Sequence, residues 1–296
     1  MKTSGWVLFA LIILSACKKE IPADNIEGSE DVLVVNALFT PDSVWKVNVS
    51  KSKHILSNVN EKNYLENATV VIASSKGFSE KLNHTQWGIY RSQAKPEEGE
   101  VYSIAVESYG FKKVEGSGYI PEKCLVTDYS VDTTNSDGSG QIKIKFTIND
   151  SPQANYYSIG LLWGTVGVNS SKGFGDTVYY NIGFESNSVV ISESPEGNSY
   201  YNSEAFFTDE TFNGKDITIN LLIEDHNING FRPSDNNFIT LVVSTHTPDA
   251  FLYRKSTQLQ YNNGNDIFSQ PVLIHSNIEN GLGIFSGINQ TRIILE

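Results

Sequence analysis

The stretch QIKIKF, residues 141–146, alternates polar and apolar side chains at every step. Successive side chains of a β-strand point to opposite faces, so this pattern predicts a strand with one buried and one solvent-facing side. The polar run TTNSDGSG at 133–140 comes directly before it and predicts a hairpin loop. The centre of the chain therefore predicts β-sheet rather than helix.

Similar short runs continue on both sides of this stretch and are separated by turn-forming residues. Toward the C-terminus they lie at 156–166, 178–184, 189–191, 217–223, 238–244, 272–274 and 291–295. Toward the N-terminus they lie at 32–35, 44–49, 68–72, 87–90 and 101–106. Short strands at this spacing predict an all-β chain of two β-sandwich domains, immunoglobulin-like or transthyretin-like, at 32–121 and 122–296.

One segment near the C-terminus predicts a short helix instead of a strand. Thr247 is a residue type that caps helix N-termini, and Pro248 occupies the favoured first helical position. Leu252 and Leu259 are spaced to share one face of that helix. We therefore expect one short helix among the strands.

Glycines in two further stretches predict turns and a close backbone approach. The tripeptide GSG at 116–118 predicts a turn, and Asn280-Gly281 favours a tight turn before an apolar strand at 282–285. Two glycines, Gly281 and Gly283, fall within this last short run. They predict a close backbone approach, either to a neighbouring strand or to a partner.

The first residues resemble an export signal. The apolar run at 6–14 is too short to cross roughly 30 Å of hydrocarbon as a permanent helix. The tetrad LSAC at 14–17 then resembles a bacterial lipobox, whose cysteine is acylated once the signal is cut away. We predict a signal peptide at 1–16, lipidation of Cys17 and a polar tether at 17–31. The alternative is an ordinary secretory signal that contains a cysteine.

Net charge argues against one class of partner, and the cysteine count argues against an internal disulfide. The 296 residues carry a formal net charge of −12, which argues against a nucleic-acid partner because phosphate backbones are bound by clustered Lys and Arg. With Cys17 acylated, Cys124 has no second cysteine with which to form an internal disulfide. Cys124 also lies at the start of a predicted strand, so we expect a buried, unreactive thiol there.

Catalytic and metal-binding patterns are sparse. The five histidines show no zinc-binding spacing, and no serine lies in a G-x-S-x-G motif, so we predict that the protein is not an enzyme. The run DHNING at 225–230 fits the first half of a calcium loop, in which Asp225, Asn227 and Asn229 supply oxygen ligands. Asn236 stands where that loop carries a bidentate Glu, so the alternative is a plain Asn- and Gly-rich loop. We expect no other cofactor.

Aromatic residues occur as adjacent pairs at 156–157, 179–180, 200–201 and 206–207. Because neighbours on a strand point to opposite faces, each pair is expected to place one ring inward and one outward. Outward rings such as Tyr200 and Tyr201 are candidates for binding a glycan or a peptide. The alternative is ordinary strand composition without a ligand.

Three stretches carry a family resemblance: DETFNG at 209–214, DIFSQPV at 266–272 and SNIENGLGIF at 276–285. Together with the lipobox and the two-part β pattern, they resemble the Bacteroidota outer-membrane lipoproteins catalogued as domain of unknown function forty-two forty-nine. The resemblance implies no catalytic residues. It implies a partner in the outer membrane, which is a TonB-dependent transporter of the SusC kind or another barrel protein.

These observations predict an outer-membrane protein that is held by its lipid anchor and works with a barrel protein. The tripeptide KKE at 18–20 only partly resembles the acid-rich export tag of such lipoproteins. The side of the membrane therefore stays open, with the cell surface favoured over the periplasmic face. A surface module that binds a glycan or a peptide through exposed aromatics is the alternative function.

Overall fold

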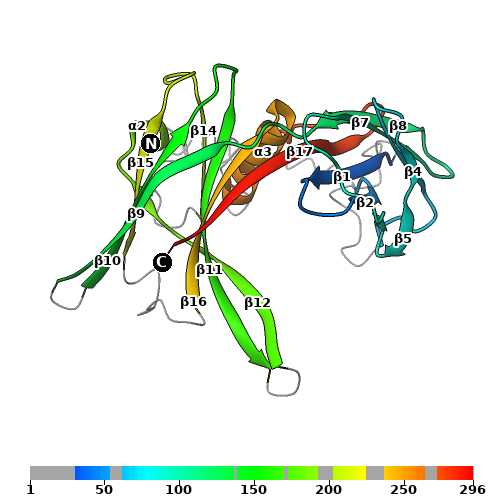
Figure 1. Ribbon diagram of the computed structural model, residues 1–296. Helices are drawn as coiled ribbons and strands as arrows, with labels where there is room; N and C mark the ends of the chain where they lie inside the picture. Colours follow the sequence, from blue (N-terminus) through cyan, green and yellow to red (C-terminus); the bar gives the residue numbers. More distant parts are fainter. Residues whose placement is uncertain are drawn as a thin grey trace, which may run out of the picture. The chain divides into compact units, whose positions relative to one another are not determined.

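The computed structural model describes residues 31–53, 62–136, 139–169, 173–192, 203–224, 237–263 and 272–295. Val32–Ser52 and Asn63–Glu296 form one compact unit. Met1–Asp31 and Lys53–Lys62 form a second unit, nearly all of which lies outside the described residues. Strands dominate the described chain (Figure 1), which confirms the all-β prediction. No helix in these ranges is both long and apolar enough to cross a membrane.

Nine strands join in one sheet. The order across it is β12-β11-β16-β17-β1-β2-β6-β5, and β14 pairs with the part of β11 that β12 leaves free. The bounds of these strands are β1 (Leu33–Phe39), β2 (Lys46–Lys51), β5 (Asn83–Gln86), β6 (Ile89–Arg91), β11 (Tyr156–Asn169), β12 (Gly173–Ile182), β14 (Glu204–Thr208), β16 (Asn237–His246) and β17 (Leu282–Leu295).

Two smaller sheets of four strands each accompany the large one. The first has the order β4-β3-β7-β8, with bounds β3 (Thr69–Ser74), β4 (Ser79–Lys81), β7 (Val101–Glu107) and β8 (Val114–Tyr119). The second has the order β13-β15-β10-β9, with bounds β9 (Leu125–Ser136), β10 (Ser139–Asn149), β13 (Glu185–Ser186) and β15 (Ile217–Glu224). Each small sheet shares a hydrophobic cluster with part of the large sheet.

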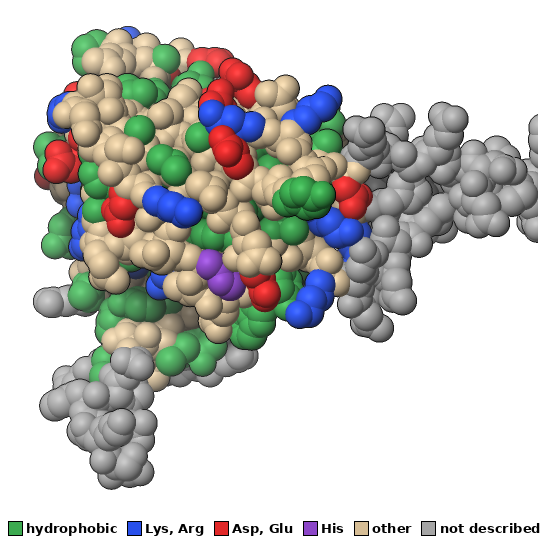
Figure 2. Space-filling view, turned by 90° about the vertical axis from the view of Figure 1, so that its right-hand side faces the viewer, with side chains coloured by type: hydrophobic (Ala, Val, Ile, Leu, Met, Phe, Trp, Pro, Cys, Tyr) green, Lys and Arg blue, Asp and Glu red, His purple; other side chains and the backbone are tan. Residues whose placement is uncertain are grey.

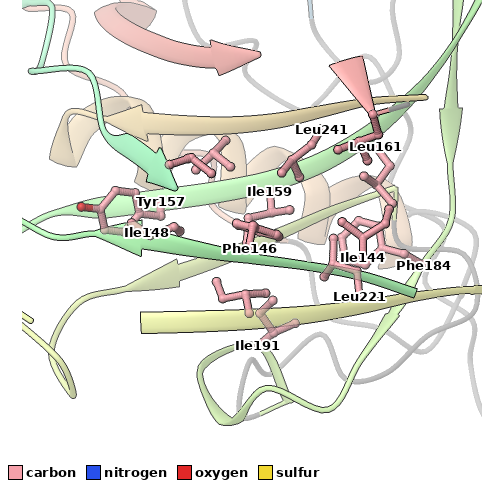
Figure 3. Close-up of a cluster of buried hydrophobic side chains, with 14 of the residues drawn as sticks. Ile144, Phe146, Ile148, Tyr157, Ile159, Leu161, Phe184, Ile191, Leu221 and Leu241 are labelled. Carbon is pink, nitrogen blue, oxygen red and sulfur yellow. The ribbon is translucent and has the colours of Figure 1, made fainter. Parts of the chain in front are cut away.

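These two clusters are the first and second cores of the protein. The first core joins side chains of β1 and β2 to those of β3 and β7, such as Val35, Val47, Val70 and Ile104. The second core joins β10 and β15 to β11 and β16, and Figure 3 shows part of it, including Phe146, Ile159, Leu221 and Leu241. This layering of sheets agrees with the predicted sandwiches. The predicted domain boundary between residues 121 and 122 stays a prediction.

The stretch that predicted a strand forms the middle of β10. Ile142, Ile144 and Phe146 are buried in the second core, whereas Lys143 and Lys145 are exposed. The alternation is therefore confirmed residue by residue. The polar run before it is mostly strand rather than loop, because residues 133–136 of β9 pair with residues 139–142 of β10.

The last strand belongs to both cores. Its first half pairs in parallel with β1, from Val34 opposite Leu282 to Phe39 opposite Gly287. Its second half pairs antiparallel with β16, up to Ile239 opposite Leu295. Phe285 consequently lies in the first core, and Leu295 at the other end of the strand lies in the second core.

The predicted helix is confirmed as α3 (Pro248–Asn263). The hydroxyl of Thr247 accepts a hydrogen bond from the backbone N–H of Ala250 at 3.2 Å, as an N-cap residue does. The face that carries Leu252 is not the buried one, however, because Leu252 is 47% exposed. In the part of the helix whose side chains are described, Ala250 and Phe251 are the buried residues.

Three other predictions need correction. Val189–Ser192 is a short helix, α2, rather than a strand, because the carbonyl of Ser188 accepts a helical-turn hydrogen bond from Ile191. Residues 272–274 are not a strand, and Leu273 is 93% exposed. The GSG tripeptide lies inside β8 and makes no turn. A Cβ on Gly118 would lie 2.5 Å from the carbonyl oxygen of Phe285, so glycine allows β8 to cross β17 closely.

Candidate functional site

The site residues predicted from the sequence all lie outside the described residues. They are Cys17, Tyr200, Tyr201, Asp225, Asn227 and Asn229. Their assignments to lipidation, to ligand contact and to calcium stay predictions. Among the residues that are described, no three His, Cys, Asp or Glu side chains gather in a metal-binding arrangement.

Two of the aromatic pairs span the sheet as predicted. Tyr157 and Phe207 point into the second core, and their neighbours Tyr156 and Phe206 point to the opposite face. Helix α3 packs on that opposite face, and both outward rings contact Phe251 of the helix. Phe206 is therefore buried beneath the helix, whereas Tyr156 is only partly buried by it.

A third pair is open to solvent. Tyr179 and Tyr180 are 47% and 60% exposed, and Val178 beside them is 48% exposed. All three belong to β12, the outermost strand at one end of the nine-stranded sheet. Tyr180 shares a face of β12 with Ile182, which belongs to the second core, but the ring is exposed, so the prediction of one buried ring is wrong for this pair.

Neighbouring strands extend this aromatic surface on both faces of the sheet. Tyr180 pairs with Trp163 of β11, and Tyr179 pairs with Gly164. The ring of Phe238 from β16 covers Gly164 so closely that a Cβ there would lie 2.5 Å from it. Tyr179 meets Phe238 edge to face at 6.2 Å between ring centroids. We call β12 with these flanking rings the aromatic edge.

The aromatic edge differs from the other outer strands of the described sheets. Residues 177–182, TVYYNI, pair regularly with 161–166 and contain no charged side chain. Natural proteins usually protect a sheet edge with a short strand, a charge, a bulge or a covering segment. Such features occur at β4 and β13, which are very short, at β5 and β9, whose pairing is interrupted by a register shift, and at β8, which is bridged by Glu279. The pairing of β12 with β11 also shifts register, between Val166 and Val168, so the regular part of this edge is confined to residues 177–182.

A separate cleft of about 370 Å³ lies where the segment linking β8 to β9 meets β11, β16 and the start of α3. Three tyrosines, Tyr119, Tyr156 and Tyr157, line it, and so do Pro121 and Pro248. Burial raises the pKa of the Tyr119 hydroxyl, and the nearby Tyr156 and Asp249 add to the shift. The Tyr119 phenol is therefore a neutral hydrogen-bond donor at ordinary pH.

The loop between β10 and β11 forms one wall of this cleft and is held from behind. The buried carboxylate of Asp209 accepts a hydrogen bond from the backbone N–H of Asn155 at 2.7 Å. Asp150 accepts one from the Tyr157 hydroxyl at 2.5 Å and one from the N–H of Gly214 at 2.7 Å. The DETFNG stretch, singled out by the family resemblance, thus braces this wall.

The opposite wall is braced by the other described landmark, SNIENGLGIF. The side-chain amide of Asn277 donates to the carbonyl oxygens of Ser117 at 3.1 Å and Phe285 at 3.0 Å. Its oxygen accepts from the N–H of Phe285 at 2.9 Å. Asn277 therefore fixes β8, which carries Tyr119, against β17.

The floor between the walls is held by β17 as well. Buried Asn289 donates to the carbonyl oxygen of Pro121 at 3.0 Å, and Thr291 donates to that of Cys124 at 2.6 Å. Cys124 is buried as predicted, and burial raises the pKa of its thiol. It is thus a packing residue rather than a thiolate nucleophile.

One interior cluster resembles a serine–histidine pair. The Ser158 hydroxyl lies 2.6 Å from Glu204 Oε1 and 2.8 Å from His246 Nε2. Since its single proton goes to the carboxylate, Nε2 carries the hydrogen that Ser158 accepts, and Nδ1 is an acceptor without a partner. Burial holds the pKa of His246 well below 6.5. Ser158 is itself buried, so it links β11 to β14 and β16 and does not face a substrate.

Charge on the surface is mixed. On the face shown in Figure 2, Lys and Arg side chains lie singly and are interspersed with Asp and Glu. The described side chains of that face therefore form no patch of a single sign. The two features that stand out from the described surface are the aromatic edge and the cleft.

Comparison with known proteins gives one family. A family model described as "Domain of unknown function (DUF4249)" matches residues 18–294. No curated protein matches the chain. Among solved structures, the chain is similar to Escherichia coli alpha-2-macroglobulin activated by porcine elastase, with 10% sequence identity and a TM-score of 0.22. That match covers 73% of this chain and 18% of the other chain. It indicates neither a shared fold nor a shared function.

Proposed function

The chain belongs to the DUF4249 family, and on that premise we propose that it is a non-catalytic accessory lipoprotein of the Bacteroidota outer membrane. It is anchored through Cys17 and docks on a barrel protein, such as a TonB-dependent transporter of the SusC kind. The lipobox-like tetrad at 14–17 supports the anchor. The aromatic edge supports the docking.

The observation that carries the proposal is the regular, uncharged edge at residues 177–182. An outer strand presents a row of backbone donors and acceptors, and strand addition is a recurring mode of protein recognition. Three adjacent exposed apolar side chains, Val178, Tyr179 and Tyr180, add contact area at the same place. Leaving such an edge bare is a liability unless a partner covers it.

The occupant that fits this edge is an extended segment of the barrel protein. Its backbone would pair with β12 as a further strand, and its alternate side chains would pack on Tyr179 and Phe238 on one face and on Tyr180 and Trp163 on the other. Aromatic rings are enriched at the energetic centres of protein interfaces. A charged residue placed on the edge should therefore prevent docking.

The test is affinity pull-down of the tagged full chain from detergent-solubilised outer membranes. We expect the wild type to recover a barrel protein, and Tyr180→Lys to recover at least about tenfold less, because a lysine at an edge blocks strand addition. Mass spectrometry of the same preparation should find a diacylglyceride on Cys17.

Tyr109→Lys is the matched control, since Tyr109 is fully exposed in a turn away from β12. It should recover as much barrel protein as the wild type. Recovery of no barrel protein by the wild type would overturn the proposal, and so would equal recovery by both lysine variants.

A further inference from the structure

We infer that the cleft between the linking segment and the β10–β11 loop binds a single neutral sugar unit. This inference concerns a different place from the aromatic edge and does not depend on docking there. A volume of about 370 Å³ lies within the range of small-ligand sites. The argument rests on the bracing of the cleft, on its lining groups and on its charge.

The cleft is preformed. Hydrogen bonds to Asp209 and Asp150 hold the loop wall. Asn277 holds the β8 wall, and Asn289 and Thr291 hold the floor. Groups that are fixed before binding lose little conformational entropy when a ligand arrives. The bracing therefore holds the lining groups in place before a ligand arrives.

The lining groups match a polyhydroxylated ring. Tyr119 and Tyr156 come from strands of different sheets and supply aromatic surface that can pack on the C–H face of a sugar. Asn149 and Gln153 supply amides, each of which both donates and accepts hydrogen bonds, as a sugar hydroxyl does, whereas the Asn155 amide is hydrogen-bonded to Ser151. Thr127 donates to Asn149 Oδ1 at 3.0 Å, which leaves the amide hydrogens of Asn149 as donors.

The charge of the lining favours a neutral ligand. Glu122 and Lys123 are adjacent, both are exposed, and their charges offset each other. His246 also lines the cleft and stays neutral because burial lowers its pKa. The charged lining side chains therefore sum to no net charge, and the cleft offers no unpaired charge to a phosphorylated or carboxylated sugar.

The test is isothermal calorimetry on the full chain in detergent, with glucose, galactose, mannose, N-acetylglucosamine and maltose as probes. We expect saturable binding of at least one of them. Tyr119→Ala, which removes an aromatic wall, and Gln153→Ala, which removes an amide from an exposed loop, should each weaken that binding at least about tenfold. Gln153→Ala keeps the test decisive if Tyr119→Ala fails to fold.

Tyr129→Ala is the matched control, because Tyr129 is an exposed tyrosine on β9 that does not line the cleft. It and Tyr180→Lys should bind the sugar as the wild type does. No saturable binding of any probe would overturn the inference, as would equal binding by all variants. Because Tyr180→Lys reports on docking and Gln153→Ala on the cleft, failure of one proposal is distinguishable from failure of the other.

Discussion

At the scale of single residues, Gly283 shows how tightly β17 lies against β1. Its φ is +114°, and a Cβ built on it would lie 2.0 Å from the carbonyl oxygen of Val35. The close approach predicted for this run is therefore made to a neighbouring strand of the same chain. Glycine is required here both for the backbone conformation and for the space.

We predict that Gly283→Ala destabilises the protein by more than about 3 kcal/mol, since it combines a disfavoured φ with a backbone clash. Gly77→Ala separates the two effects. Gly77 has a φ of +94°, but nothing lies within 4 Å of a Cβ there, so this variant should lose only about 1–2 kcal/mol. Urea unfolding measures both, and equal losses would show that the clash at Gly283 is relieved by a small backbone shift.

At the scale of elements, α3 is tied to the sheet at its first turn. The Thr247 hydroxyl accepts from the N–H of Ala250 and lies 2.5 Å from the Ser286 hydroxyl of β17. Further along, Arg254 pairs with Glu204 of β14, and the Tyr253 hydroxyl donates to Asn36 of β1 at 3.2 Å. The helix thus joins strands from both halves of the large sheet.

Thr247→Ala should lower the free energy of unfolding by about 1–2 kcal/mol, because the first turn loses its cap and Ser286 loses a buried partner. Thr247→Ser keeps the hydroxyl and should lose much less. Thermal and chemical denaturation compare the two variants. If serine proved as harmful as alanine, packing of the threonine methyl group rather than capping would be the dominant contribution.

At the scale of the whole described unit, β17 makes the two cores mechanically dependent. The side chain of Phe285 is fully buried and packs on Phe39 and Trp45 of the first core, at 4.8 and 5.9 Å between ring centroids. A few residues further along the same strand, the backbone pairs with β16 above the second core. Local unfolding at one end of β17 should therefore raise local unfolding at the other end.

Phe285→Ala should destabilise the protein by about 3–5 kcal/mol and should raise amide hydrogen exchange in both β1 and β16. Ile72→Ala is the control, because Ile72 is equally buried in the first core but lies on β3, away from β17. Its effect on exchange should be concentrated in the first core. Unchanged exchange of β16 in Phe285→Ala would mean that the cores unfold independently.

Local pattern alone misassigned residues where a contact from a distant segment outweighs periodicity. Val189–Ser192 is as apolar as many strands, but the Ser186 hydroxyl accepts a hydrogen bond from the N–H of Ser188, and the Ser188 hydroxyl accepts one from the N–H of Asn220, which favours a turn of helix. Alternation places the outward rings Tyr156 and Phe206 on the far side of the sheet from the core, and α3 packs against both of them there. Alternation predicts which side of a strand a ring occupies, but it does not indicate what packs there.

By itself, the sequence determined the strand content, the buried side of β10 and the cap of α3, because each depends on the conformation of a few consecutive residues. Tertiary structure alone decided the sharing of β17 between two cores, the exposure of β12 and the assembly of the cleft. These depend on segments far apart in the chain, such as β8, the β10–β11 loop and the start of α3. A periodic pattern encodes burial, but it does not encode which distant surface supplies it.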